Sequence, residues 1–309
     1  MDLLLPLHQR KQPASWVAIG AFDGVHHGHQ VLFRHLVAGA HQAGLPAVVI
    51  TFEPLPGVFF NHQTNGYAIS SLEDRLNLIR DLGVDDIIVL NFTREFADIE
   101  AAVFMREVKN TLGLQQLVAG FNFALGKDAA GTVTELQHLG EQLGFLVHVE
   151  SPVRVEGKVV SSSNIRKSLR EGDIRSANAM LGRRFTLDGE VIHGEHRGGK
   201  LGIPTANLSI ARGRLLPANG VYVTRAHVGG KTYDAVTNVG VRPTFDNPLP
   251  APRIEPHLLD TQEDFYQQQL CLEFLDYLRP EQKFPDSQAL VAQIQQDIAR
   301  AREVFAHEP

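Results

Sequence analysis

The chain has 309 residues, enough for two domains that each bury a core. A formal net charge of -6 leaves no basic surplus for a phosphate backbone, which argues against a nucleic-acid partner. The single cysteine, Cys271, excludes an intrachain disulfide and fits a reducing compartment. Residues 1–15 show neither a signal peptide nor an apolar run of membrane length, so we expect a cytoplasmic protein without membrane association.

In the first half of the chain, apolar runs typical of buried strands alternate with helical patterns. The predicted strands cover residues 16–19, 47–52, 86–90, 116–120 and 145–149. The predicted helices cover residues 30–42, 72 to about 83, 100–112, 132–143, 164–170 and 173–181. This alternation predicts a doubly wound α/β domain around a mostly parallel sheet.

After Gly182 the pattern changes to short strands separated by turns. The predicted strands cover residues 185–192, 221–228, 231–239, 253–259 and 270–278. Helical spacing returns only after residue 286, where one amphipathic helix is expected. We therefore predict a small antiparallel β-barrel domain with a C-terminal helix, and domain boundaries of 1–183 and 184–309.

The stretch from Gly20 to His29 joins the first predicted strand to the first predicted helix. Such a turn lies at the carboxyl edge of the sheet, where ligands bind in α/β folds. His26 and His29 are three residues apart and would share one face of the first helical turn. Two imidazoles beside a helix N-terminus suit a transferring phosphoryl group. The alternative is a chance pattern of surface histidines.

Three further segments would reach the same region. Phe52 to Pro56 and Gly120 to Gly126 each follow a predicted strand, and Ser161 to Arg166 leads into a helix start that would suit a polyphosphate. Each also has a plain structural interpretation: a stiff proline loop, aromatic core filling or an ordinary helix cap.

Together these motifs resemble the adenylyltransferase half of the bacterial bifunctional riboflavin kinase/FAD synthetase family. The resemblance implies a Rossmann-like nucleotidyltransferase domain that transfers AMP from ATP to FMN and releases pyrophosphate. It implies that His26 and His29 are catalytic and that the flavin contacts are Pro54, Asn122 and Phe123. The implied ATP and phosphate contacts are Gly20, Phe22, Asp23, Gly24, Ser162, Ser163 and Arg166. Ala21 and Ala124 depart from the Asn and Arg that many relatives carry.

In the second half, a glycine-rich stretch containing Gly194, Gly198 and Gly202 precedes Pro204. In an extended segment Thr205 and Asn207 would point the same way and offer two neutral oxygens to a phosphate-bound magnesium ion. Glu255 is the candidate general base, although a lone Glu on a strand is more often a solvated edge residue.

These motifs resemble the riboflavin kinase half of the same family. The resemblance implies that the three glycines bind ATP, that Thr205 and Asn207 bind ATP and Mg2+, and that Glu255 takes the proton from the ribityl hydroxyl. Gly199 replaces a common Arg, and Pro256 stands where β-branched residues are usual. Because proline cannot donate to a ladder, Pro256 predicts a bulge or an edge strand.

We therefore expect a bifunctional enzyme that converts riboflavin to FMN and FMN to FAD with ATP and Mg2+. The expected partners are small molecules only, and the expected assembly is a monomer or a weak homo-oligomer. Two alternatives stay open at this point: that only one activity is retained, or that the chain is a non-catalytic flavin-binding regulator on the same scaffold.

Overall fold

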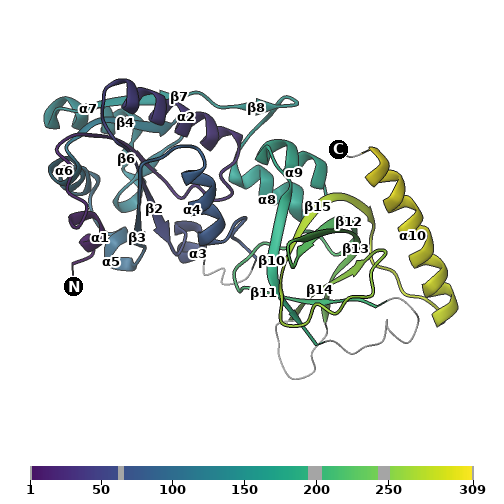
Figure 1. The fold of residues 1–309 in the computed structure, drawn as a ribbon. Helices are drawn as coiled ribbons and strands as arrows, with labels where there is room; N and C mark the ends of the chain where they lie inside the picture. Colours follow the sequence, from purple (N-terminus) through teal and green to yellow (C-terminus); the bar gives the residue numbers. More distant parts are fainter. Residues whose placement is uncertain (1, 62–65, 194–203, 243–250, 308–309) are drawn as a thin grey trace. The chain divides into compact units, whose positions relative to one another are not determined.

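The computed structural model describes residues 2–61, 66–193, 204–242 and 251–307 (Figure 1). Their contacts divide the chain into two compact units, Met1–Ser162 and Ser163–Pro309. Each unit is built on its own main sheet.

The first unit is built on a parallel sheet of five strands in the order β3-β2-β1-β4-β7. The strands are β1 (Ser15–Ile19), β2 (Ala47–Glu53), β3 (Asp86–Asn91), β4 (Leu114–Gly120) and β7 (Leu146–Glu150). β1 pairs with β2 on one side and with β4 on the other, so the strand order reverses there. This reversal is the point at which doubly wound sheets bind ligands, at the carboxyl ends of the strands.

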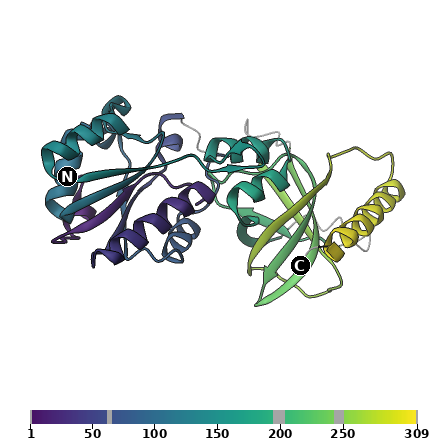
Figure 2. The ribbon, with the colours of Figure 1, turned by 90° about the horizontal axis from the view of Figure 1, so that it is seen from above.

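Helices cover both faces of this sheet, and two separate cores result (Figure 2). One face packs against α1 (Leu5–His8), α6 (Ala101–Leu112) and α7 (Val133–Leu143). The other face packs against α2 (His27–Gln42) and α4 (Leu72–Arg80). Successive side chains of a strand point to opposite faces of the sheet, so β1 contributes to both cores. Val17 and Ile19 belong to one core, and Ala18 belongs to the other.

Shorter elements connect these parts. They are α3 (Pro56–Asn61), α5 (Arg94–Ala97), the 3-10 turn η1 (Lys127–Ala129), the pair β5 (Ala124–Leu125) and β6 (Gly131–Thr132), and the hairpin β8 (Arg154–Val155) and β9 (Lys158–Val159). The hairpin turns at Glu156 and Gly157, which both have positive φ.

The second unit is an antiparallel sheet of six strands in the order β11-β10-β15-β12-β13-β14. The strands are β10 (Phe185–Ile192), β11 (Asn207–Ile210), β12 (Gly220–Val228), β13 (Lys231–Arg242), β14 (Ala251–Leu258) and β15 (Gln269–Arg279). The two end strands approach each other, and the N–H of Ala206 donates to the carbonyl of Pro256 at 2.9 Å. The sheet is thus a nearly closed barrel, and β14 is an edge strand, as expected from Pro256.

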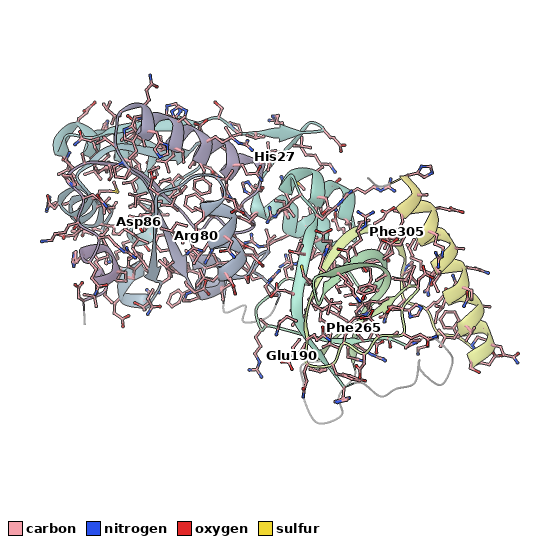
Figure 3. All side chains as sticks on the ribbon, viewed as in Figure 1. His27, Arg80, Asp86, Glu190, Phe265 and Phe305 are labelled. Atoms are coloured by element: carbon pink, nitrogen blue, oxygen red, sulfur yellow. The ribbon has the colours of Figure 1, made fainter. Side chains whose placement is uncertain are left out.

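One outer face of the barrel is covered by α10 (Ser287–His307). Ala301 of this helix packs against a buried cluster that includes Val223 and Leu275, and Figure 3 shows Phe305 on the barrel side of α10. Asp297, which is 1% exposed, accepts from Nε of Arg279 at 3.0 Å and from Nη2 at 2.8 Å. This buried charge-assisted pair fastens the helix to β15.

Two helices precede the barrel, α8 (Ser162–Arg170) and α9 (Ile174–Leu181). Asn178 of α9 donates from Nδ2 to the carbonyl of Phe274 at 2.8 Å and accepts the N–H of Phe185 at 2.7 Å. α9 is therefore bonded to β15 and β10, and the contact pattern groups both helices with the barrel. The boundary at residue 183 stays a prediction from sequence texture.

The predicted fold class is confirmed in both halves: a doubly wound parallel sheet, then a small antiparallel barrel with a C-terminal helix. The sequence did not predict strand β11, because a four-residue strand beside a glycine-rich stretch carries too short a pattern.

Candidate active sites

The histidine turn, which runs from Gly20 to His29, lies where the strand order of the parallel sheet reverses. His26 is the N-cap of α2, and its Nδ1 accepts the backbone N–H of His29 at 3.3 Å. The two imidazole rings stack, with 3.6 Å between centroids and 15° between planes. The edge of Phe22 meets the His29 ring at 5.2 Å and 88°. The sequence therefore brings both histidines to one helix start, as their spacing predicted.

The backbone of this turn is unusual for side-chain-bearing residues. Phe22 and Val25 have φ of 48° and 38°, in the left-handed region. A Cβ on Gly20 would lie 2.9 Å from the Phe22 ring, so only glycine fits there. Such conformations cost free energy and persist where the surrounding structure enforces them, often at functional sites.

The surroundings of His29 set its protonation state. Burial among neighbouring groups lowers the pKa of His29 well below the usual 6.5, and repulsion from His26 lowers it further. The Nδ1 atom of His29 is buried and has no hydrogen-bond partner among the described residues. The unliganded turn therefore carries a neutral imidazole at position 29 near neutral pH.

Asp23 holds the turn in place through its side chain. Its buried carboxylate accepts the N–H of Ile69 at 3.0 Å and that of Ser70 at 3.2 Å. The Ser70 hydroxyl in turn accepts the N–H of Gly24 at 3.1 Å. The side chain of Asp23 thus points into the loop before α4, whereas its backbone carbonyl accepts from Oγ of Ser162 at 2.9 Å.

Sequence reasoning missed Arg75, which is 1% exposed on α4. Its guanidinium donates to the carbonyl of Ala21 at 2.9 Å, to the carbonyl of Phe52 at 2.9 Å and to the carboxylate of Glu53 at 2.8 Å. Burial lowers the pKa of Arg75, and the negative charge of Glu53 opposes this shift. Arg75 therefore ties the loop after β1 to the end of β2. An arginine in an amphipathic helix gave no sequence signal for such burial.

The three predicted flavin contacts lie at the same sheet edge. Pro54 directly follows β2, and Asn122 and Phe123 follow β4. Asn122 is exposed, whereas Phe123 packs partly buried against the core beneath the sheet. Phe121 is 48% exposed and is the free aromatic ring of this loop.

The predicted phosphate contacts of α8 fall on both sides of the unit division. Ser162 belongs to the first unit and reaches the histidine turn through Asp23. Ser163 and Arg166 belong to the second unit, where Arg166 is buried. Their approach to the histidine turn stays a prediction.

A second set of predicted residues lies at the seam of the barrel, where the end strands β11 and β14 approach each other. Leu208 of β11 is buried, so its neighbour Asn207 faces the other side of the strand with exposed Ile192 as its partner. The bond from Ala206 to Pro256 brings the backbone that carries Thr205 and Asn207 next to the part of β14 that carries Glu255. Nδ1 of His257 lies 2.7 Å from the carbonyl of Pro204 and supports the same seam. Gly194, Gly198 and Gly202 lie outside the described residues.

Glu255 is half-buried in a charged setting. Its carboxylate lies 2.6 Å from Nη2 of Arg253, and its side chain is 13% exposed. In the β13–β14 ladder Glu255 is paired with Asn238, whose Nδ2 donates to Glu281 at 3.2 Å. Glu255 is thus no freely solvated edge residue, because a cation and an amide flank it.

Two family models divide the chain as the two sites do. The FAD synthetase model matches residues 8–164, and the riboflavin kinase model matches residues 181–305. A curated protein from Pseudomonas fluorescens, named bifunctional riboflavin kinase/FMN adenylyltransferase, is 38% identical over 99% of this chain and 98% of its own length. The chain belongs to the bifunctional riboflavin kinase/FMN adenylyltransferase family.

A second relative of this family, from Bacillus subtilis and with the same printed name, is 35% identical over 97% of this chain and 96% of its own. Among solved structures, one titled macrolide-efflux protein from Streptococcus pneumoniae matches with a TM-score of 0.85 and 30% identity, covering 96% of both chains. The helices that the structure describes in the present chain include none that is long and apolar enough to span a membrane. The similarity to these relatives and to this solved structure extends over nearly the whole chain.

Proposed function

We propose that this chain phosphorylates riboflavin to FMN in its second unit and adenylylates FMN to FAD in its first, with ATP as the donor in both reactions. The observation that carries the proposal is the pair of stacked imidazoles at the start of α2, at the ligand-binding edge of a sheet that belongs to the FAD synthetase family. The separate carboxylate of Glu255 in the riboflavin kinase region supports the other half.

In the adenylylation reaction of the first unit, an FMN phosphate oxygen attacks the α-phosphorus of ATP. The bond from the α-phosphorus to the oxygen that bridges it to the β-phosphate breaks, and pyrophosphate leaves. The FMN phosphate is already anionic, so positioning and charge stabilisation carry the rate. We assign this stabilisation to His26, to His29 and to the N–H groups that begin α2. The low pKa of His29 supports a neutral ring that donates a hydrogen bond.

The surrounding residues would shape and hold the substrates. Gly20, Phe22 and Gly24 form the turn beneath the triphosphate, and Asp23 positions that turn through Ile69 and Ser70. We assign Ser162, Ser163 and Arg166 to the β- and γ-phosphates, and Pro54, Asn122 and Phe123 to the flavin. The exposure of Asn122 at the sheet edge supports its part in this set.

In the phosphorylation reaction of the second unit, Glu255 takes the proton of the ribityl hydroxyl as that oxygen attacks the γ-phosphorus of ATP, and ADP leaves. Thr205 and Asn207 offer the neutral oxygen donors that suit a magnesium ion, which would arrive with ATP and neutralise phosphate charge. Their shared position at the barrel seam, next to the part of β14 that carries Glu255, supports this set. Gly194, Gly198 and Gly202 complete it by resemblance to the family.

We further propose a cytoplasmic monomer or weak homo-oligomer that binds small molecules and no nucleic acid, consistent with the net charge of -6. The proposed division of labour is residues 1–183 for adenylylation and 184–309 for phosphorylation.

The test supplies each half-reaction separately. Purified protein is incubated with ATP and Mg2+ and with either riboflavin or FMN, and the flavins are separated by chromatography. The proposal expects FMN and FAD from riboflavin, and FAD with pyrophosphate from FMN. One missing product would reduce the protein to a single activity, and flavin binding without any ATP turnover would make it a carrier.

A further inference from the structure

A cluster of possible metal ligands lies in the first unit and contains none of the residues assigned to catalysis. It consists of His35 on α2 with His148 and Glu150 on β7. One ligand atom from each residue lies within 4.8 Å of the other two. Nδ1 of His35 and Nε2 of His148 are each 3.2 Å from Oε1 of Glu150. Neither proposed reaction uses these side chains.

The spacing of the three ligand atoms suits a small cation. Two ligands at about 2.0–2.1 Å from Zn2+, separated by a tetrahedral angle, lie about 3.4 Å apart. Both imidazole nitrogens stand close to that distance from the carboxylate oxygen. Oε1 of Glu150 is nevertheless buried and has no hydrogen-bond partner among the described residues. A buried oxygen that accepts no well-oriented hydrogen bond is costly, and a metal ion between the three atoms would remove that cost.

The three side chains are held by ordered neighbours. The rings of His35 and His148 stack at 3.9 Å and 20°. The indole of Trp16 stacks on the His35 ring, with 6.4 Å between the ring centroids. Gly39 makes room for that indole, since a Cβ there would lie 2.1 Å from Trp16. Ligands on a helix and a strand, rather than on loops, form a precise site.

We propose that His35, His148 and Glu150 bind one divalent transition-metal ion of the zinc class. Two imidazoles and one carboxylate are ligands for Zn2+, Co2+ or Ni2+, whereas Mg2+ and Ca2+ prefer oxygen ligands alone. Three protein ligands leave a further coordination position for water, which the exposure of His35 and His148 permits. The ion links α2, which begins at the catalytic turn, to β7 at the edge of the sheet.

The test uses the full chain and Co2+ as a probe, in the absence of ATP and flavin. Trp16 is the only tryptophan in the sequence and its ring stacks on His35, so its fluorescence reports on this cluster. The proposal expects Co2+ to quench that fluorescence at one ion per chain, and Zn2+ but not excess Mg2+ to reverse the quenching. In the variants His35→Ala, His148→Ala and Glu150→Gln, the affinity for Co2+ falls at least about tenfold.

His41→Ala is the matched control. His41 also lies on α2 and also pairs with a carboxylate, that of Asp85 at 2.8 Å. Among the residues that the structure describes, it belongs to no group of three possible metal ligands. Its affinity for Co2+ should equal that of the wild type. The proposal is overturned if Co2+ leaves Trp16 fluorescence unchanged, if Mg2+ displaces Co2+ from the wild type, or if all three variants bind as tightly as His41→Ala. The isosteric Glu150→Gln and the wild-type competition keep the test valid even if an alanine variant misfolds.

Discussion

The imidazole rings of His26 and His29 lie face to face, 3.6 Å apart, while His26 also caps the helix that carries His29. Protonation of both rings at this distance is unfavourable because the two positive charges repel each other, and burial makes the charged forms less favourable still. The low pKa of His29 follows from this arrangement, so the turn offers a neutral donor before substrate arrives.

Replacing His29 by alanine should lower FAD formation from FMN by more than tenfold, about 1.4 kcal/mol of barrier, because a donor to the reacting phosphates is lost. His27→Ala is the control, since His27 is the adjacent residue of α2 and has no part in the ring stack. Initial rates of FAD and FMN formation measure both variants. A His29→Ala protein with an unimpaired FAD yield would refute the role.

Stability should depend on His29 at mildly acidic pH. Because the folded pKa of His29 is lowered below 6.5, the unfolded chain takes up the proton first as the pH falls. The free energy of unfolding contributed by the neutral ring is present above about 6.5 and is lost as the pH falls below it. Denaturant unfolding at about pH 7.5 and about pH 5.5 should show a smaller loss for His29→Gln than for the wild type. An equal loss in both proteins would contradict the assignment.

The variant Arg75→Lys tests the hydrogen bonds by which Arg75 joins the loop after β1 to the end of β2. A lysine has one donor centre and no planar fork, so it does not serve the carbonyls of Ala21 and Phe52 and the carboxylate of Glu53 together. We expect a loss of about 1–3 kcal/mol in the free energy of unfolding of the first unit, together with slower FAD formation. Denaturant unfolding measures the first and the flavin assay the second. Arg80→Lys, on the last turn of the same helix, is the control and should change neither.

Glu255→Gln should abolish FMN formation, by about a hundredfold or more, and leave FMN adenylylation intact. The amide keeps the size of the side chain but accepts no proton from the ribityl hydroxyl. Glu190→Gln, an exposed glutamate on β10, is the control and should leave both activities unchanged. Flavin chromatography with riboflavin or FMN as substrate separates the two effects. Loss of both activities in a folded Glu255→Gln protein would argue against two separate sites.

Local patterns predicted most of the fold. Apolar runs that alternate with helical patterns predicted the five parallel strands, and Pro256 predicted that β14 is bulged or at an edge. The spacing of His26 and His29 predicted a shared helix start. In these cases the deciding interactions lie within a few residues of one another.

Long-range features were out of reach. Arg75 is buried only because carbonyls from two other loops converge on it, and nothing in its own helix signals that. His148 and Glu150 meet His35 only once β7 has joined the sheet beside β4. The side-chain role of Asp23 likewise depends on a loop distant in the sequence.

The bonds of Asn178 bear on any attempt to study the halves apart. A truncated gene that begins at Arg184 would discard α9, leaving the carbonyl of Phe274 and the N–H of Phe185 without their partner in the barrel. A fragment that begins at Ser163 keeps both hydrogen bonds, and we expect it to be more stable than the fragment that begins at Arg184.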